Sequence, residues 1–538
     1  MIAKRNVPYH YFLNPDQSIF ENYIKISKVD PAGNRTGAPE MLGKHPYHTT
    51  YILKEFALKC FTDQQFWKEL AKDELEEALR VKWNMNTAKN VIMFIGDGMG
   101  PNTVTATRMY KGGESHRLSY EKFPHVGLLK TYSADKMVPD SACTATALLC
   151  GVKTNQMTIG LDASVKHGDC SGSLQPKASI NKRTGVVTTM RVTHATPSPM
   201  YAHSADRQWE CDSKMPAGTE QCKDIARQLV EDWPGKDLHV ILGGGRQALG
   251  ANINTTEDPW SCSRKDGRNL IKAYEKDKQT RRLKYTLVSN NEELKNFNTE
   301  DTDYLFGIFA DSHMNYEHER ERGPSGSPSI SEMFEAALKV LSKNEKGFLL
   351  MVEGGNIDMA HHRGKAKKAV DESSAMEDAV QLAINVTNVR DTLLIVTSDH
   401  GHTLTINGYP YRGSNIFGIA GKSPHDGINY TTLSYGTGGP SAFKYQIQSV
   451  QNKSVISRKD PSLEKTDDFE YEQIAAVIVD ENTHGGGDVI IYARGPWSHL
   501  FHNVHEQHYV YHAVSYAAKI GDYADSQVNV ERELTPGR

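Results

Sequence analysis

Short apolar runs that do not alternate with polar residues recur along this chain, and helical patterns separate them. Such runs are typical of strands that are covered by helices on both faces. We predict strands at Asn90–Ile95, Val126–Lys130, Gly185–Met190, His239–Leu242, Gly347–Val352, Thr392–Thr397 and Val489–Ala493. We predict helices at Asp63–Val81, Asn102–Tyr110, Ser141–Leu149, Cys222–Asp232, Ser329–Ser342, Lys365–Val386 and Val504–Ile520. This alternation predicts an α/β fold with a central, mostly parallel β-sheet flanked by helices on both faces.

The length and the charge set broad limits. The chain has 538 residues, enough for one large domain with insertions or for two to three ordinary domains. Residues 1 to about 60 show no clear period, and Thr403–Thr483 reads as an irregular insertion with short strands. Lys plus Arg is 62 and Asp plus Glu is 66, so the net charge is −4. We find no signature of binding to nucleic acid or to a membrane surface.

The cysteines and the sequons bear on the cellular compartment. The 7 cysteines include no CxxC pair, which argues against a zinc finger. Asn-x-Ser/Thr sequons, compatible with secretion, begin at Asn34, Asn254, Asn385, Asn429 and Asn452. We expect no secretory signal at the start, no membrane-spanning run and no hydrophobic anchor tail at the polar end.

Ser141 begins a run of small residues that predicts a helix, directly after Pro139 and Asp140. The first turn of a helix offers unpaired backbone N–H groups and the positive end of the helix dipole, which favour an anion. Ser141 is therefore a candidate nucleophile for a phosphate ester. Taken alone, Asp140 or Ser141 as a simple N-cap is the commoner explanation.

Asp97 follows the predicted strand Asn90–Ile95 and has a glycine on either side. Ligands bind at the carboxyl ends of the strands in open α/β sheets, so this carboxylate is a candidate ligand. The glycines do not fit the GxGxxG spacing of a dinucleotide-binding loop. An aspartate in a simple turn is the alternative.

The end of the strand Gly347–Val352 carries a denser group of ligand-type residues: Glu353, Asp358 and His362. Asp358 and His362 are four residues apart, so they would share one face of a helix. A carboxylate and an imidazole placed in this way suit a zinc ion.

Later segments add further candidate ligands. Asp399 and His400 emerge at the end of the strand Thr392–Thr397, in the same kind of position as Asp97. His484 lies before three glycines that would not obstruct an ion, although alone it would be interpreted as a loop histidine.

The segment Thr193–Arg207 adds a hydroxyl group and a guanidinium group. Thr196 offers an oxygen to a hard cation, and Arg207 offers a planar fork that fits a phosphate, although an isolated arginine is usually a surface residue. With Ser141, the set comprises a hydroxyl nucleophile, oxygen ligands for magnesium and carboxylate–imidazole sets for zinc. This combination is typical of two-metal phosphoryl transfer.

Six segments resemble the animal form of the alkaline phosphatase family, in the family's order. They are Ile95–Gly100, Pro139–Thr146, His194–Arg207, Glu353–His362, Asp399–His402 and Thr483–Asp488. The resemblance runs from about Asp63 to about Ile520. It implies an alkaline phosphatase domain at residues 63–538, with a crown-like insertion at 403–483, after an unassigned extension at 1–62.

The resemblance implies a role for each candidate residue. Ser141 would be the phosphorylated nucleophile, and Arg207 would hold two phosphate oxygens. One Zn²⁺ would be bound by Asp358, His362 and His484. A second Zn²⁺ would be bound by Asp97, Asp399, His400 and the Ser141 oxygen. One Mg²⁺ would be bound by Asp97, Thr196 and Glu353. Residues around these ligands would be Asp140, His194, Met359 and His402.

The expected reaction is the hydrolysis of phosphate monoesters through a phosphoserine on Ser141. Because binding concentrates on the phosphoryl group, we expect the enzyme to tolerate many leaving groups. The resemblance also implies a homodimer in which Tyr409 reaches the active site of the other subunit.

Two residues near the expected site depart from the family pattern. Met359 stands where the animal enzymes usually carry a histidine. Since a thioether cannot hold a water or a phosphate as an imidazole can, we expect an effect on rate and phosphate affinity. Cys143 stands where glycine is common, and we interpret it as a buried filler and not as a second nucleophile.

The family's calcium site has few matching residues in this chain. Glu257 or Asp258 could match one acidic ligand, but Ala310 stands where another is expected. Ser325–Ser327 offers no carboxylate for the last ligand. We therefore expect this Ca²⁺ site to be absent or weak.

The resemblance implies a disulfide between Cys170 and Cys222, and Cys211 with Cys262 is a second candidate pair. The implied disulfide and the sequons favour the secretory route. The family implies an extracellular or cell-surface location, with membrane contact only through a lipid anchor that is not visible in this chain.

Two other functions stay open. A phosphodiesterase of the same superfamily would use a similar site, although Arg207 with a magnesium set favours monoesters, and the sulfatase signature is absent around Ser141. A weakly active surface protein used for binding is the alternative outside enzymes. The presence of every expected metal ligand argues against it.

Overall fold

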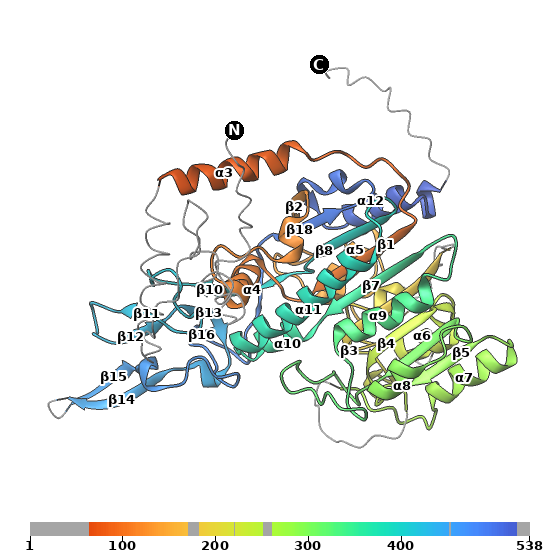
Figure 1. Cartoon of the computed structure of the whole chain (residues 1–538). Helices are drawn as coiled ribbons and strands as arrows, with labels where there is room; N and C mark the ends of the chain where they lie inside the picture. The colour runs from red at the N-terminus through yellow and green to blue at the C-terminus, as the bar shows by residue number, and fades with distance from the viewer. Residues whose placement is uncertain (1–63, 171–181, 220, 251–260, 451–452, 525–538) are drawn as a thin grey trace, which may run out of the picture. The chain divides into compact units, whose positions relative to one another are not determined.

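The computed structural model describes residues 64–170, 182–219, 221–250, 261–450 and 453–524 (Figure 1). The chain divides into two units, Met1–Lys82 and Trp83–Arg538. In the first unit, helix α3 spans Gln64–Leu79, close to its predicted bounds, and buries none of its side chains. The extension predicted at 1–62 lies outside the described residues.

The second unit is built on a ten-stranded sheet in the order β19-β2-β18-β8-β1-β7-β3-β4-β6-β5. Its strands are β1 Asn90–Gly96, β2 His125–Lys130, β3 Arg183–Arg191, β4 Val240–Gly244, β5 Tyr285–Val288, β6 Tyr304–Ile308, β7 Phe348–Gly354, β8 Thr392–Thr397, β18 Val489–Arg494 and β19 Asn503–Glu506. Among these described strands, only β18 runs antiparallel to its neighbours, which are β2 and β8. The predicted fold class is confirmed.

All seven predicted strands belong to this sheet, but the end of the chain differs from its prediction. The helix predicted at Val504–Ile520 begins only at Tyr509, where α12 (Tyr509–Ala518) starts. Its first residues form β19, in which Val504 lies opposite Leu128 of β2. Pairing with a distant strand overrides the local helical pattern, and the sequence could not reveal it. The strands β5 and β6 were likewise not predicted.

Helices cover both faces of the sheet (Figure 1). Val91, Met93 and Ile95 of β1 face one buried cluster, whereas Ile92 and Phe94 face the other. The helices of the first cluster are α5 Ser141–Cys150, α6 Ile225–Glu231, α7 Leu270–Thr280 and α12. The helices of the second are α4 Pro101–Gly112, α8 Asn291–Asn296, α9 Ile330–Leu341, α10 Asn356–His362 and α11 Ala366–Val386. Because both faces are buried, the strands are apolar throughout.

Residues 403–483 form short strands outside the large sheet. They are β10 Leu404–Ile406, β11 Ile419–Lys422, β12 Asn429–Thr431, β13 Leu433–Gly438, β14 Tyr445–Val450, β15 Lys453–Arg458 and β16 Ala475–Ile478. The strands β10, β13 and β16 form one sheet, and the others form two hairpins. Among the described residues, no helix is both long and apolar enough to span a bilayer.

Two disulfides join cysteines of the described residues, Cys170–Cys222 and Cys211–Cys262. These are the implied pair and the second candidate pair. Cys143 is free and buried.

The packing of α9 can be tested at Phe334, which is fully buried and has its ring centroid 5.5 Å from that of Phe94. Phe334→Ala should lower the free energy of unfolding by about 3–5 kcal/mol, because it leaves a large cavity. Tyr411→Ala, at a side chain that is 92% exposed, should change it by less than about 0.5 kcal/mol. Urea unfolding measures both, and equal losses would contradict the buried position of Phe334.

Candidate active site

Four adjacent parallel strands, β8, β1, β7 and β3, bring the predicted ligands to one edge of the sheet. Asp97 follows β1, Glu353 lies in β7, Asp399 follows β8, and Thr196 lies in the turn after β3. All four side chains are fully buried. The topology thus gathers residues that lie up to 302 positions apart, since 399 − 97 = 302.

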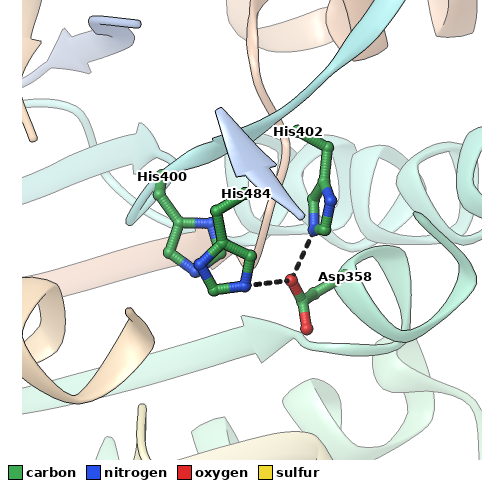
Figure 2. A group of neighbouring side chains, drawn as sticks. All are labelled: Asp358, His400, His402 and His484. Carbon is green, nitrogen blue, oxygen red and sulfur yellow. Dashed lines mark hydrogen bonds and ion pairs between the residues drawn. The ribbon is translucent and has the colours of Figure 1, made fainter. Parts of the chain in front are cut away.

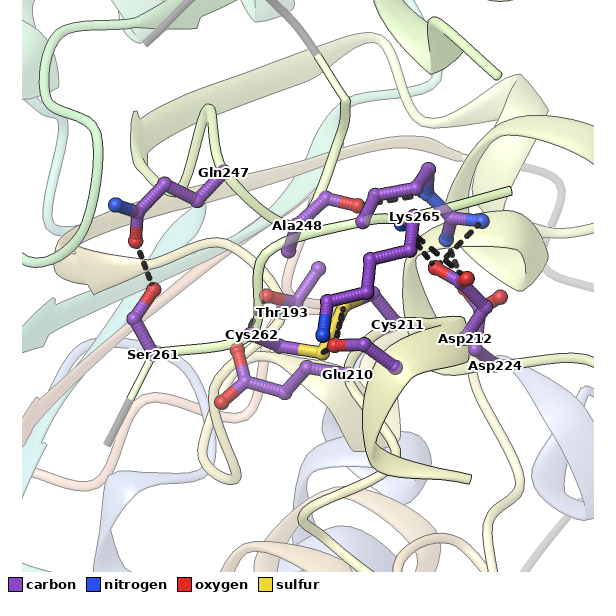
Figure 3. Close-up of a disulfide and its surroundings, with 12 residues drawn as sticks. Thr193, Glu210, Cys211, Asp212, Asp224, Gln247, Ala248, Ser261, Cys262 and Lys265 are labelled. Carbon is purple, nitrogen blue, oxygen red and sulfur yellow. Dashed lines mark hydrogen bonds and ion pairs between the residues drawn. A yellow bond between two sulfur atoms is a disulfide. The ribbon is translucent and has the colours of Figure 1, made fainter. Parts of the chain in front are cut away.

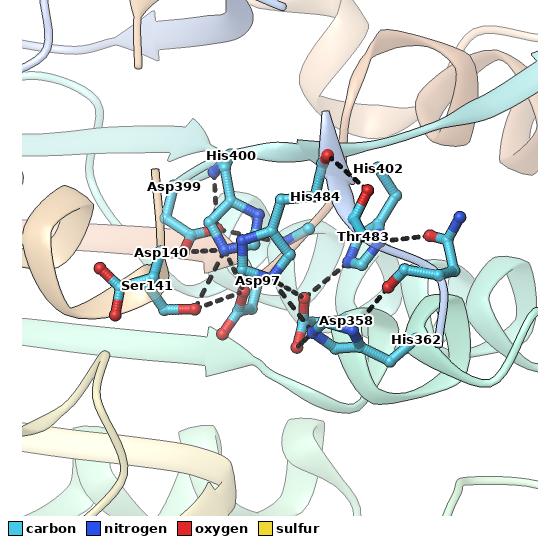
Figure 4. A network of polar contacts seen from close by, with 12 residues as sticks. Asp97, Asp140, Ser141, Asp358, His362, Asp399, His400, His402, Thr483 and His484 are labelled. Carbon is cyan, nitrogen blue, oxygen red and sulfur yellow. Dashed lines mark hydrogen bonds and ion pairs between the residues drawn. The ribbon is translucent and has the colours of Figure 1, made fainter. Parts of the chain in front are cut away.

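Ser141 reaches this edge from the first turn of α5, as predicted (Figure 4). Asp140 is the N-cap of the helix and accepts a hydrogen bond from the backbone N–H of Cys143 at 3.4 Å. The Ser141 Oγ lies 3.0 Å from His400 Nε2 and 3.4 Å from Asp97 Oδ1. The serine therefore contacts both of the ligand types predicted around it.

Asp358 and His362 lie on the short helix α10 (Asn356–His362), which follows β7 directly. The His362 Nε2 is 3.3 Å from Asp358 Oδ2. The His484 Nε2 is 3.5 Å from Asp358 Oδ1 and 3.1 Å from His362 Nε2. The three residues predicted to share one zinc ion therefore meet through their ligand atoms.

Backbone carbonyls fix which nitrogen of each imidazole is free. The Nδ1 of His362 lies 2.8 Å from the Asn482 carbonyl oxygen, and the Nδ1 of His484 lies 2.8 Å from that of Pro139. Since a carbonyl only accepts, each Nδ1–H donates, and each neutral ring carries its lone pair on Nε2. In the neutral rings that a metal ion requires, the two Nε2 lone pairs would face each other beside a carboxylate, an arrangement suited to a cation.

A related group consists of Asp358, His400, His402 and His484, with ligand atoms within 4.8 Å of one another (Figure 2). It differs from the predicted zinc set, since it has His400 and His402 in place of His362. The His402 Nε2 lies 2.7 Å from Asp358 Oδ1, and its Nδ1 lies 2.6 Å from Asn482 Oδ1.

Two more groups lie deeper, around Asp97. One consists of Asp97, Asp399 and His400, and the other of Asp97, His194 and Glu353. Thr196, predicted for the magnesium set, donates to Asp97 Oδ2 at 3.2 Å. Among the described residues, the buried Glu353 Oε1 has no hydrogen-bond partner. Such an orphaned carboxylate oxygen fits a metal ligand.

Arg207 lies beside the nucleophile. Its Nη1 donates to Asp140 Oδ2 at 3.1 Å, and its Nη2 lies 3.1 Å from His194 Nε2. Because a guanidinium has no acceptor, His194 accepts this hydrogen bond. The N-cap aspartate of α5 thus ties the arginine to the helix that carries Ser141.

The carboxyl groups are difficult to ionise together. Burial, and then repulsion from Asp399, raises the pKa of Asp97 well above its usual range. Burial is also the main cause that raises the pKa of Glu353 to about 8 and that of Asp399 to about 6. Bound cations would offset this cost, so the carboxylate set fits divalent metals.

Asp358 differs from these carboxyl groups. Burial alone would raise its pKa, but the charge of His362 and hydrogen bonds from neighbouring imidazoles hold its pKa well below its usual range. Asp358 in turn raises the pKa of His362 to about 9, against the effect of burial.

Met359 and Cys143 lie near the site. Met359 is half-buried on α10. Burial raises the pKa of the Cys143 thiol far above its usual range. Tyr409 is 99% exposed in the 403–483 segment. Glu257 and Asp258 lie outside the described residues, so the expectation about calcium stays a prediction.

Three supporting residues were missed by the sequence analysis. Thr188 donates to Glu353 Oε2 at 2.5 Å, and Gln507 Nε2 donates to the Asp399 carbonyl at 2.6 Å. Their partners are 165 and 108 residues away, so no local pattern marks them. Asn482, which contacts His362 and His402, lies two residues before His484 and could have been noticed there.

A mostly parallel sheet that carries a buried serine and three candidate metal-binding groups at its carboxyl edge defines a class, the metal-dependent α/β enzymes.

Comparisons with known proteins specify the family. A sequence model described as alkaline phosphatase matches residues 88–520. The tissue-nonspecific alkaline phosphatase of Felis catus is 43% identical over 486 residues, which cover 86% of this chain and 90% of that protein. The alkaline phosphatase of Gadus morhua is 42% identical over 483 residues, covering 85% and 98%. An alkaline phosphatase from the Antarctic bacterium TAB5 shares the fold, with a TM-score of 0.55 at 23% identity, covering 81% of this chain and 99% of that one.

The chain therefore belongs to the alkaline phosphatase family, and it is an enzyme that hydrolyses phosphate monoesters. The resemblance seen in the sequence is confirmed. The family match begins at residue 88, later than the Asp63 suggested by the sequence.

The raised pKa of Glu353 predicts how the metal-free protein responds to pH. The folded protein retains a proton that the unfolded chain releases near pH 4.3, so stability falls as the pH rises from there toward the folded pKa of about 8. Glu353→Gln cannot lose this proton. In chelator-treated samples, its melting temperature should therefore rise relative to wild type between pH 5 and pH 8.

The histidines that titrate in this pH range are present in both proteins. Their contribution therefore cancels when the two melting temperatures are compared at the same pH. Glu335→Gln, at a side chain that is 55% exposed on α9, is the matched control and should show no such trend. A constant difference between Glu353→Gln and wild type over this range would contradict the raised pKa.

Proposed function

We propose that this alkaline phosphatase hydrolyses phosphate monoesters through a phosphoserine on Ser141. The observation that carries the proposal is the position of its Oγ, buried at the start of α5 and 3.0 Å from His400 Nε2. In the first step Oγ loses its proton and bonds to phosphorus, the bond from phosphorus to the leaving oxygen breaks, and that oxygen takes up a proton. In the second step the oxygen of a water bonds to phosphorus, the bond from phosphorus to Oγ breaks, and a proton from the water returns to Oγ as phosphate leaves.

We propose two Zn²⁺ ions and one Mg²⁺ ion per chain as cofactors. The first zinc set is Asp358, His362 and His484. The second is Asp97, Asp399, His400 and Ser141. The magnesium set is Asp97, Thr196 and Glu353. When bound, these ions lower the pKa of the serine hydroxyl and neutralise charge on the phosphate.

The protein's own groups bind and orient the phosphoryl group. Arg207 presents its guanidinium to two phosphate oxygens, held in place by Asp140 and His194. The backbone N–H groups at the start of α5 favour negative charge beside Ser141. Since none of these contacts involves the leaving group, we propose broad leaving-group tolerance.

The proposal extends to the setting of the enzyme. Two disulfides are typical of an oxidising compartment, which supports an extracellular or cell-surface glycoprotein. The fully exposed Tyr409 supports a homodimer in which this side chain contacts the other subunit.

Ser141→Ala tests the nucleophile. The hydrolysis of p-nitrophenyl phosphate should fall by roughly three orders of magnitude or more, because no hydroxyl remains to attack. Rapid acid quenching of wild type with ³²P-labelled substrate should trap label on Ser141. Cys143→Ala, at another buried position in the first turn of α5, is the matched control and should retain activity. An active Ser141→Ala enzyme would overturn the proposal.

Arg207→Ala tests the proposed phosphate-binding site. Loss of the charge-assisted hydrogen bonds from the guanidinium should raise the KM for p-nitrophenyl phosphate and the inhibition constant of inorganic phosphate by roughly 10- to 100-fold.

A comparison of two substrates in wild type separates the activities. Hydrolysis of bis-p-nitrophenyl phosphate should stay far below that of the monoester. A wild type that prefers the diester would favour the phosphodiesterase alternative.

A further inference from the structure

Arg191, at the end of β3, is a buried arginine three residues before His194. The Arg191 side chain is 3% exposed and forms a two-pronged ion pair with Glu210, with Nη2 to Oε1 at 2.7 Å and Nε to Oε2 at 2.9 Å. The Glu210 side chain is itself only 6% exposed. Because a buried ion pair adds little net stability to a fold, stability alone does not account for this pair.

Two contacts lead from this pair toward His194. Thr193, the residue before His194, donates to Glu210 Oε2 at 2.5 Å. The Arg191 Nη1 lies 2.6 Å from the His313 Nε2, and since arginine only donates, neutral His313 accepts. The ring of His313 meets that of His194 edge to face, with centroids 5.3 Å apart.

His194 depends on these contacts for its orientation. Its Nδ1 is buried and has no hydrogen-bond partner among the described residues, and its Nε2 accepts from Arg207 at 3.1 Å. Backbone attachment through Thr193 and ring packing on His313 therefore set the direction in which His194 meets Arg207.

The outer end of this chain of contacts is anchored by a disulfide. Cys211, the neighbour of Glu210, is bonded to Cys262, and both are buried (Figure 3). Two residues after Cys262, the buried Arg264 donates to the N-cap aspartate of α6, Asp224, at 2.5 Å. The disulfide thus ties the segment that carries Glu210 to a second fixed segment.

We propose that Glu210, anchored by the Cys211–Cys262 disulfide, is a positioning residue that holds Arg207 in its phosphate-binding orientation through Arg191, His313 and His194. The inference rests on the proposed role of Arg207 in binding phosphate. It explains a buried ion pair that touches neither Ser141 nor a predicted metal ligand.

The test is the inhibition constant of inorganic phosphate in Glu210→Gln, Arg207→Ala and the double variant, with metals added in excess. Glu210→Gln should raise this constant by roughly 5- to 30-fold, with a smaller change in kcat, because the arginine is misplaced. In the Arg207→Ala background, Glu210→Gln should add nothing further. A merely structural role would lower the melting temperature and the active fraction without this coupling.

His313 provides a second route if Glu210→Gln does not fold. His313→Gln keeps an acceptor for Arg191 but removes the ring that packs on His194, whereas His313→Leu removes both. We expect a raised inhibition constant in both variants, with the larger rise in His313→Leu. A wild-type value in His313→Leu would overturn the contact through His313.

The two disulfides supply a matched comparison, because they span 51 and 52 residues and so constrain the unfolded chain almost equally. Replacing Cys211 and Cys262 by alanine should raise the inhibition constant of phosphate. Replacing Cys170 and Cys222 should cost similar stability without that rise. A rise in both double variants would overturn the specific link to Glu210.

The outcomes separate the inference from the proposed function. If Arg207→Ala leaves the inhibition constant unchanged, the proposed phosphate site is wrong. If Arg207→Ala raises it while Glu210→Gln does not, the phosphate site stands and the positioning role is overturned. Additive effects in the double variant would also overturn the positioning role.

Discussion

The burial of four neighbouring carboxyl groups is the constraint on which the rest of this structure depends. Asp97, Glu353 and Asp399 are fully buried, and Asp358 is 3% exposed. Removing such charges from water costs several kcal/mol each unless they are paired. Three of these groups show raised pKa values, the sign that protein groups alone do not compensate them. Divalent cations are the compensation that this donor set fits.

The fold makes such a costly cluster tolerable. Adjacent parallel strands end at one edge, so their next residues converge without any long loop. Helices on both faces bury the strands. The free energy gained from this apolar burial offsets the cost of burying the polar cluster. The same edge receives the start of α5, which presents Ser141 and its dipole to the cluster.

A layer of neutral groups orients the ligands. Carbonyl oxygens of Asn482 and Pro139 accept hydrogen bonds from the Nδ1 atoms of His362 and His484, so that both Nε2 atoms face Asp358. The side chain of Thr188 donates to one oxygen of Glu353, and the other oxygen has no hydrogen-bond partner in the described part of the chain. The site is thus organised to present unshared electron pairs to a common point.

The sequence predicted what local pattern and chain order can carry. Unbroken apolar runs located seven strands of the sheet, and ligand-type residues directly after them located Asp97, Glu353 and Asp399. Contacts between distant segments could not be predicted from local patterns. Such contacts place the first residues of a predicted helix in β19. They also bring Thr188 to Glu353 and Gln507 to the Asp399 carbonyl. No local sequence pattern marks the ion pair of Arg191 and Glu210. Its contact with His313 arises only in the folded chain, because His313 is far away in the sequence.

The metal content of the purified protein tests whether bound cations complete the carboxylate cluster, as we propose. Purified wild type and Glu353→Gln would be dialysed against metal-free buffer, and zinc and magnesium per chain would be measured by inductively coupled plasma mass spectrometry, with activity assayed on the same samples. We expect two zinc ions and one magnesium ion per chain in wild type, and the selective loss of magnesium in Glu353→Gln. A fully active wild type that retains neither metal would contradict it.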